Sequence, residues 1–445
     1  MLGTVRSVLS ADFPQLRPFI ENAPSRLDGI DAEEIAPPDG IAPKKTGASA
    51  LLLAGRARSR RAQLAQSATN YDFPFVEESL REIQNHPDVI DEEEQRQLNG
   101  DVELLKSVQT EEGELAAIAD RLRELLRKNG RAYHYGWRKE DRGGRKSLLR
   151  SIQALLLFAE ARKMGNVELD RRLHFLGSGD KAKIYSYRGQ KGGRMAFKEL
   201  PKSNWREDGW DAVANLAVGA LCDLLATRGA PPLVVRAIPA VVNGKVGLAM
   251  PIVPGKNLRR HPNNSAFWKS PSFRRQEIWL QILDCIGGET DRYVRNVFWD
   301  EATETLTAID SDTSFPLSHR CPTIRWDPVT KEGRPQRYCI PPVIDTDIWT
   351  VIEGLSEEEL RECLQEIGFF GEQIDAACAR LKALKSHKFC VITPDQWAND
   401  ELLREGGCTD TNCCFLLHLE QSKAMKKGLS PRNGEGFLTG TWPSS

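Results

Sequence analysis

The feature that most constrains the fold is a change of pattern near residue 171. Short segments with strand character begin there and are separated by glycine-containing turns: 173–176, 183–187 and 195–200. A helical stretch over 210–225 follows, and Asn243-Gly244 then predicts a two-residue hairpin turn between two further strands. Three strands, one helix and two strands predict an α+β domain that contains a small antiparallel sheet.

Helical periodicity precedes these strands. Leu115 and Leu122 lie on one face at helical spacing, in a helix that we expect to end at Asn129-Gly130. A second amphipathic stretch covers 146–163. We interpret residues 75–168 as a helical accessory module packed on the strand-containing domain, because a leucine stripe of this kind is much more often core than a partner-binding groove.

Helical signals also dominate the residues after the strands. Ser356–Glu359 has the pattern of a capping box that begins a helix, and a second helix is expected over 371–384. Residues 170–253 are therefore expected to form a β-rich part of the domain, and residues 254–390 a larger, mainly helical part.

The two ends of the chain differ from the middle in composition. Residues 1–70 contain several prolines and a stretch of Gly, Ala, Ser and Arg, so they bury too little apolar area to offset their ordering entropy, and we expect disorder. The run Arg56–Arg61 is interpreted as a solvated basic patch, with a targeting role or contact with lipid headgroups as the alternatives. Residues 391–445 are expected to form a C-terminal extension that is partly flexible.

The composition is that of an ordinary globular protein, with 40% hydrophobic and 28% charged residues. The net charge of -1 gives no electrostatic reason to expect nucleic acid as a partner. The chain lacks an apolar run of about 18 residues, so no transmembrane segment is expected. The N-terminus lacks the pattern of a cleaved secretory signal, and the ten cysteines have no dense, regular spacing, which favours a reduced intracellular setting.

Candidate phosphate-binding groups lie in the strand region. Gly177, Ser178 and Gly179 stand between two strand segments, and glycine lets backbone N–H donors approach phosphates closely. A plain hairpin turn would have the same signature. Lys198, on the third strand segment, could reach phosphates as a point charge, although a strand lysine usually faces solvent.

Three polar residues further along have a spacing that suits proton transfer and metal binding. Asp291 could accept the proton of an attacking hydroxyl, and Asn296 could offer its carbonyl oxygen to Mg²⁺. Asp310 follows an apolar strand segment and is a second candidate Mg²⁺ ligand. Each acid alone would be interpreted as a solvated loop residue, so the prediction depends on their joint spacing.

The order and spacing of Lys198, Asp291, Asn296 and Asp310 resemble those of the protein kinase-like superfamily. The run Asp-Arg-Tyr-Val-Arg-Asn that begins at Asp291 is similar to the Asp-Arg-His-x-x-Asn loop of phosphoinositide kinases and of actin-fragmin kinase. The run Ile309–Pro316 resembles the Ile-Asp-Asn-x-x-Ser-Phe run of that branch.

This resemblance implies a two-lobed kinase-like fold over residues 170–390 that binds ATP and Mg²⁺. Lys198 would hold phosphates, and Asp291 would be the catalytic aspartate. Asn296 and Asp310 would bind the metal. The resemblance also implies that Gly177, Ser178 and Gly179 cover the phosphates. Met250 and Ile252 would lie at a hinge that faces the adenine.

The sequence departs from the family pattern in several places. The small-lobe helix glutamate that pairs with the lysine is not evident, because Asn215 falls near its expected place and Asp211 one turn earlier. If Asn215 takes that place, the ion pair of Lys198 would be missing. Tyr293 stands where the relatives often have histidine, and the motifs Asp-Phe-Gly and Ala-Pro-Glu are absent.

The function expected from these residues is ATP- and Mg²⁺-dependent phosphotransfer to a hydroxyl of a protein or a phosphoinositide. The departures leave two alternatives open. One is a pseudokinase scaffold that binds partners, and the other is a kinase fold that catalyses another transfer, such as AMPylation.

Other signals are weaker. We expect a cytoplasmic protein, and the arginine- and serine-containing N-terminus joined to a divergent kinase resembles bacterial effectors that reach a host cell by a non-classical route. Cys408, Cys413, Cys414 and His418 could be zinc ligands, but adjacent cysteines within a short span do not fit a usual zinc knuckle, so structural or free thiols are expected. Cys285 lies in an apolar run and is expected to be a buried core thiol.

Overall fold

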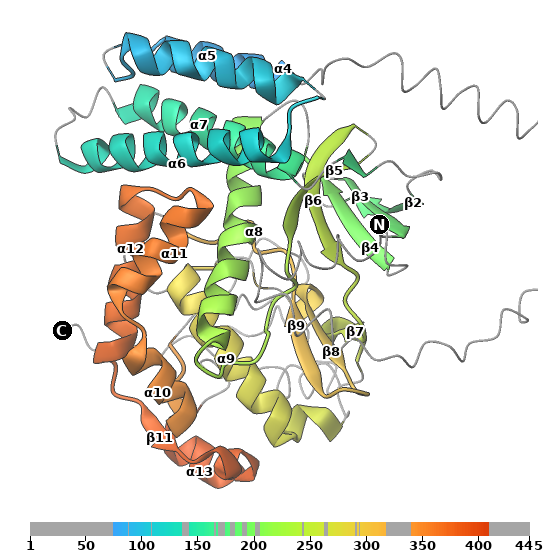
Figure 1. Cartoon of the computed structure of the whole chain (residues 1–445). Coiled ribbons are helices and arrows are strands. Elements are labelled where there is room, and N and C mark those ends of the chain that lie inside the picture. Colours follow the sequence, from blue (N-terminus) through green and yellow to red (C-terminus); the bar gives the residue numbers. More distant parts are fainter. Residues whose placement is uncertain are drawn as a thin grey trace, which may run out of the picture. The chain divides into compact units, whose positions relative to one another are not determined.

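The computed structural model describes residues 74–408 with the following gaps: 88, 108, 136–141, 164–165, 168–173, 179–182, 189–193, 201–204, 243, 262–265, 290–291, 293 and 317–339. The expectations for residues 1–70, for Cys413, for Cys414 and for His418 fall outside these residues. The described part combines helices with an antiparallel sheet (Figure 1), so the predicted α+β class is confirmed.

Four described helices precede the sheet: α4 Pro74–Gln84, α5 Glu92–Lys106, α6 Glu112–Tyr135 and α7 Arg142–Lys163. The Asp91 side chain accepts a hydrogen bond from the backbone N–H of Glu94 and so begins α5. The guanidinium of Arg162 donates to the carbonyl oxygens of Leu104 and Ser107 at 2.9 and 2.7 Å. The carbonyl oxygens at a helix end lack the N–H groups of a next turn, and Arg162 on α7 adds donors to them at the end of α5.

The predicted helix end at Asn129-Gly130 is wrong, because α6 continues to Tyr135. The Asn129 side chain donates to the carbonyl oxygen of Leu125 at 2.9 Å, inside the helix rather than beyond its end. The glycine has a packing role instead, because a Cβ on Gly130 would lie 2.5 Å from the Cβ of Phe370.

The main sheet has the described strand order β1-β5-β6-β4-β3-β2. Its strands are β1 Asn166–Val167, β2 His174–Ser178, β3 Lys183–Arg188, β4 Arg194–Glu199, β5 Ile238–Val242 and β6 Lys245–Pro251. Strands β2 to β6 pair antiparallel, and β1 joins β5 in parallel. Val242 pairs with Lys245, which confirms the predicted two-residue hairpin, and α8 Trp205–Ala226 connects β4 to β5.

The helices before the sheet share their hydrophobic core with it. Buried leucines of α7, such as Leu156, belong to one hydrophobic cluster with Leu200, Val241 of β5 and Leu248 of β6. The helix α7 packs on both α8 and β5. All these elements belong to one compact unit that begins at Asn70.

A second part of the fold follows the main sheet. A three-stranded sheet consists of β7 Lys256–Asn257, β8 Val297–Asp300 and β9 Thr305–Ala308, and β10 Val343–Asp345 pairs in parallel with β11 Cys390–Ile392. The helices are α9 Pro271–Gly287, α10 Thr346–Gly354, α11 Glu357–Ile367, α12 Gly371–Ser386 and α13 Asp400–Glu405. Short 3₁₀ helices lie between them: η2 Leu258–Arg260, η3 Ala266–Lys269, η4 Val294–Asn296 and η5 Pro394–Ala398.

The capping box predicted at Ser356 is confirmed. The Ser356 hydroxyl accepts from the backbone N–H of Glu359 at 3.1 Å, and the Glu359 carboxylate accepts from the backbone N–H of Ser356 at 2.9 Å. The helix that it begins, α11, packs along α8, and the next helix, α12, packs on α9. These contacts connect the helix of the main sheet to the later helices.

The turn between α11 and α12 fits against α6 and α7, above it in Figure 1. The side chain of Gln153 on α7 donates to the carbonyl oxygen of Gly368 at 2.8 Å. Gly368 has a φ of +96°, and a Cβ there would lie 2.7 Å from Cδ2 of Leu156. Glycine is therefore required at this turn both by the backbone conformation and by the available space.

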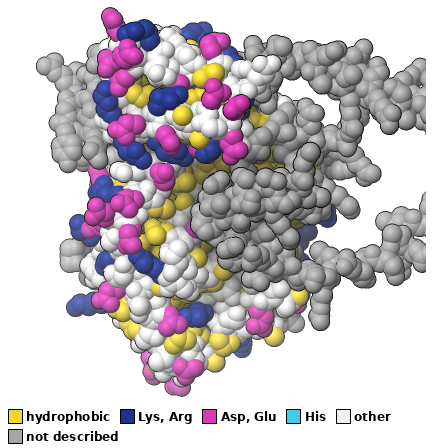
Figure 2. Space-filling view, viewed as in Figure 1, with side chains coloured by type: hydrophobic (Ala, Val, Ile, Leu, Met, Phe, Trp, Pro, Cys, Tyr) yellow, Lys and Arg dark blue, Asp and Glu magenta, His cyan; other side chains and the backbone are white. Residues whose placement is uncertain are grey.

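The visible face of α4–α7 carries interspersed basic and acidic side chains (Figure 2). Ion pairs near the surface of these helices include Lys128 with Glu94 and Arg127 with Glu124. Exposed pairs of this kind contribute little to stability, so the shared apolar core is what fixes these helices.

We expect Gly368→Ala to lower the free energy of unfolding by about 1–3 kcal/mol, because alanine avoids the left-handed conformation and its Cβ would contact Leu156. The matched control is Gly354→Ala at the end of α10, where a Cβ would meet no described atom within 4 Å. Denaturant unfolding of the two variants measures the difference. Equal stability of the two variants would contradict the described turn.

Candidate functional site

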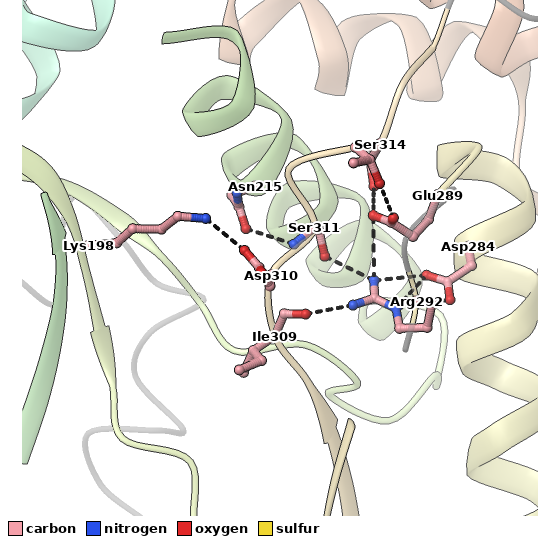
Figure 3. A network of polar contacts seen from close by, with 10 residues as sticks. Lys198, Asn215, Asp284, Glu289, Arg292, Ile309, Asp310, Ser311 and Ser314 are labelled. Atoms are coloured by element: carbon pink, nitrogen blue, oxygen red, sulfur yellow. Dashed lines mark hydrogen bonds and ion pairs between the residues drawn. The ribbon is translucent and has the colours of Figure 1, made fainter. Parts of the chain in front are cut away.

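The side chain of Lys198 lies between two carboxylates. Its Nζ is 2.7 Å from Oδ1 of Asp310 and 3.3 Å from Oδ2 of Asp312. Figure 3 shows Lys198 extending from β4 toward Asp310, which belongs to the segment after β9. The structure therefore brings together Lys198 and Asp310, two of the residues predicted for the site, although they are 112 positions apart.

Lys198 lies on an interior strand of the main sheet. Its strand β4 lies between β3 and β6, where Lys198 pairs with Ile184 and Leu248. The Lys198 side chain is 15% exposed, whereas that of Asp310 is 38% exposed, so a ligand can reach the acid while the lysine stays largely covered. The Lys198 amine therefore lies at Asp310 and Asp312, and its contact with phosphates remains a prediction.

The charge of Lys198 is stabilised by its partners. Burial alone would lower the pKa of the Lys198 ammonium, but the carboxylates of Asp310 and Asp312 outweigh burial and raise the pKa above its ordinary value. One cation between two anions leaves the group with a net negative charge. Such a group suits a divalent cation or a ligand that brings one.

Asp310 has an uncommon backbone conformation, with a φ of +60°. Residues other than glycine pay about 1–2 kcal/mol for the left-handed region, although aspartate tolerates it better than most. Hydrogen bonds hold both neighbours of Asp310. Arg292 donates to the carbonyl oxygen of Ile309 at 2.7 Å and to the hydroxyl of Ser311 at 2.9 Å, and the backbone N–H of Ser311 donates to the side-chain oxygen of Asn215 at 2.9 Å.

Arg292 is fully buried and is itself fixed by acids (Figure 3). Its guanidinium bonds both carboxylate oxygens of Asp284 at 3.0 to 3.3 Å. Glu289 lies next to it and accepts hydrogen bonds from the hydroxyl of Ser314 at 2.6 Å and from that of Thr313. Burial raises the pKa of the Glu289 carboxyl, which Arg292 opposes. These contacts tie the residues around Asp310 to the end of α9.

Asn296 lies beside the same segment. It ends η4 directly before β8, and its backbone carbonyl oxygen accepts a hydrogen bond from the backbone N–H of Ile309 at 2.8 Å. Because β8 and β9 pair antiparallel, with Val297 opposite Ala308, Asn296 and Asp310 lie at the same end of this hairpin. The backbones of Asn296 and Asp310 are therefore neighbours, and the shared binding of a metal by their side chains remains a prediction.

The donor set fits the metal that the sequence implied. Asp310, Asp312 and the amide of Asn296 offer hard oxygen atoms, which Mg²⁺ prefers, and Mg²⁺ needs few protein ligands because it retains waters. Within residues 74–408, apart from the gaps, the structure contains no cluster of three Asp, Glu, His or Cys residues that could hold a metal.

Two of the predicted site residues, Asp291 and Gly179, fall in gaps of the structure. Gly177 and Ser178, which were expected in a turn, end strand β2 instead. The pairing of β2 with β3 shifts its register between Phe175 and Gly177, and glycine accommodates such an irregularity.

The two residues predicted for the hinge lie at the end of β6. Met250 pairs with Ala196 of β4 and is partly buried. Ile252 follows the strand, and its backbone N–H donates to the carbonyl oxygen of Arg194 at 3.2 Å. Their contact with adenine remains a prediction.

The contacts described for Lys198 do not include the helix carboxylate of the family pattern. The sequence reasoning looked for an acid on the helix α8, where Asn215 stands, but the side chain of Asn215 bonds the backbone of Ser311. The acid partners of Lys198 come from the segment after β9 instead. Asp312 could have been found from the sequence, since it stands two residues after Asp310 in the same loop.

The cysteines described by the structure do not form a site. Cys285 is buried in the core as predicted, and Cys408 is buried as well. Burial raises the pKa of the Cys363 thiol to about 12 and that of Cys378 to about 11. These two thiols are therefore protonated and unreactive near neutral pH.

In comparisons with known proteins, neither a protein-family model nor a curated protein matches the chain. None of the helices seen between residues 74 and 408 is long and apolar enough to span a membrane. The kinase-like resemblance therefore remains a prediction that depends on the geometry of the site.

We expect the stability that Lys198 contributes to be lost at high pH. Its folded-state pKa lies above the ordinary value of 10.5, so the contribution is complete below that pH and disappears as the pH rises through the folded-state pKa. Lys198→Met should cost about 1–3 kcal/mol at neutral pH, and the deficit should shrink above about pH 10.5.

Thermal unfolding midpoints of wild type and Lys198→Met, measured from neutral to strongly alkaline pH, provide the test. The exposed Lys256 supplies the control, because Lys256→Met should show no such trend. A deficit of Lys198→Met that grows with pH would contradict the described ion pair.

Proposed function

We propose that this chain is an ATP- and Mg²⁺-dependent phosphotransferase with a two-lobed kinase-like fold, acting on a hydroxyl of a protein or a phosphoinositide. The observation that carries the proposal is the contact of Lys198 with Asp310 at 2.7 Å. A largely covered strand lysine beside an accessible carboxylate would place a cation for the phosphates next to a ligand for their metal, the two groups that phosphoryl transfer requires.

Each residue would have a distinct role in this reaction. Asp310, Asp312 and the amide of Asn296 would hold Mg²⁺, which when bound supplies charge neutralisation at the phosphates. Lys198 would exchange part of its contact with the acids for phosphate oxygens, which it can do because its ammonium stays charged. Asp291 would orient the acceptor hydroxyl and take its proton.

The electrostatics support this assignment. The net negative charge of Lys198, Asp310 and Asp312 repels a bare triphosphate, and a divalent cation held between the carboxylates and the phosphates would offset this repulsion. In phosphoryl transfer most of the rate gain comes from positioning and from charge stabilisation, and a network of buried hydrogen bonds around Asp310 supplies the required rigidity.

A second candidate is a pseudokinase scaffold that binds a nucleotide without transferring a group. The observation that favours it is the amide of Asn215 on α8, which bonds the backbone of Ser311 and supplies no carboxylate to Lys198. A transfer assay distinguishes the two candidates, and it also detects AMPylation if the label is placed on the α-phosphate.

We expect Asp310→Asn and Lys198→Met each to reduce transfer from γ-labelled ATP by about 10²-fold or more, since each removes a charge that would act on the transferred group. The acceptors supplied are a mixed protein lysate and phosphoinositide vesicles. The control is Lys245→Met, which removes a lysine of the neighbouring strand whose partner is Glu199.

Full transfer in both variants of a pure preparation would reject the assignment. If wild type shows no transfer but ATP with Mg²⁺ raises its unfolding midpoint, the scaffold is correct. At a nucleotide concentration of 100 times Kd the stabilisation would be about 2.7 kcal/mol.

A further inference from the structure

We infer that Arg292 and Asn215 are positioning residues that hold Asp310 in its left-handed backbone conformation and thereby aim its carboxylate at Lys198. Their role in transfer rests on the proposed function, but the geometry that they impose can be tested without it. Neither residue touches Lys198 in the contacts described, so each acts through the two neighbours of Asp310.

The backbone around Asp310 is fixed on both sides. The N–H of Ile309 donates to the carbonyl oxygen of Asn296 at 2.8 Å, and the carbonyl oxygen of Ile309 accepts from Arg292 at 2.7 Å. The N–H of Ser311 donates to Asn215 at 2.9 Å. An unfavourable backbone conformation persists only where the surroundings determine it fully, and these bonds satisfy that condition at Asp310.

Arg292 suits this role because its guanidinium is a rigid fork. One nitrogen donates to the carbonyl oxygen of Ile309 and another donates to the hydroxyl of Ser311. A single side chain therefore bonds the residue before Asp310 and the residue after it. Asp284 on α9 holds the same guanidinium from the other side. A lysine at this place would keep the charge that balances Asp284 but could not bond both neighbours in the same geometry.

The far end of the segment is fixed independently. Glu289 accepts from Ser314, and the backbone N–H of Phe315 donates to the carbonyl oxygen of Gly287 at 2.5 Å. Phe315 also has a positive φ, of +58°. The segment from Ile309 to Phe315 is therefore anchored at both ends, and Asp310 lies at the end that Arg292 and Asn215 control.

The hydrogen bond between Asn215 and Ser311 connects α8 to the segment that carries Asp310, and not to Lys198. Asn215 lies on α8, which packs against α7 and α11. A displacement of α8 would therefore release Ser311 first and change the direction of the Asp310 carboxylate, while Lys198 would remain fixed by its strand neighbours.

The test measures how fast an amine-acylating reagent modifies Lys198 in the full chain without nucleotide, using peptide mass spectrometry. In wild type, Lys198 should react more slowly than Lys382, whose side chain is 71% exposed. Arg292→Lys and Asn215→Ala should each raise the rate at Lys198 severalfold, because Asp310 turns away, and leave the rate at Lys382 unchanged.

Arg380→Lys is the matched control. Arg380 is also fully buried and also donates to backbone carbonyl oxygens, those of Ile286 and Pro316, but it does not contact the neighbours of Asp310 in the described structure. Its variant should lower the unfolding midpoint without changing the rate at Lys198. If Arg292→Lys and Asn215→Ala also lower only the midpoint, their role is purely structural and the inference is overturned.

The inference and the proposed function can fail separately. The acylation rates do not depend on phosphotransfer, so they decide the positioning role even if wild type transfers nothing. If wild type is active, Arg292→Lys should lower kcat more than it changes the KM for the acceptor. Unchanged acylation together with full transfer would overturn the positioning role and leave the proposed reaction in place.

Discussion

The ammonium of Lys198 between the carboxylates of Asp310 and Asp312 is the interaction on which the site depends. It joins the main sheet to the segment after the β8–β9 hairpin. Covering a lysine costs free energy unless an anion accompanies it, so the fold must deliver both acids to the same place. The left-handed conformation of Asp310 and the hydrogen bonds of Arg292 and Asn215 are the local means by which it does so.

The wider fold keeps the two sides of this interaction in place. The helix α7 packs on α8 and on β5, and so covers the sheet that carries Lys198. The turn at Gly368 fits against the same helices, with Gln153 bonded to its carbonyl oxygen, and α12 continues from it to α9. The helices before the sheet share one hydrophobic core with the sheet, and Phe370, at the start of α12, belongs to the same core.

Local signals predicted local structure well. The hairpin at Asn243-Gly244 and the capping box at Ser356 could be predicted from the sequence, because turn and capping chemistry is encoded within short stretches. The contact of Lys198 with Asp310, over 112 positions, could be predicted only from the resemblance to a family motif. The contacts of Arg292 and Asn215 could not, since they depend on which helices pack together over long sequence distances. The prediction at Gly130 was wrong for the same reason: its partner, Phe370, is far away in the sequence.

The most direct test of the central claim is a calorimetric titration of wild type with ATP at increasing Mg²⁺ concentration. We predict weak binding of free ATP, which the two carboxylates repel, and binding that becomes much tighter as Mg²⁺ is added. ATP that binds equally well with and without Mg²⁺, or that does not bind at all, would contradict the claim that Lys198, Asp310 and Asp312 form a site for a metal-bound triphosphate.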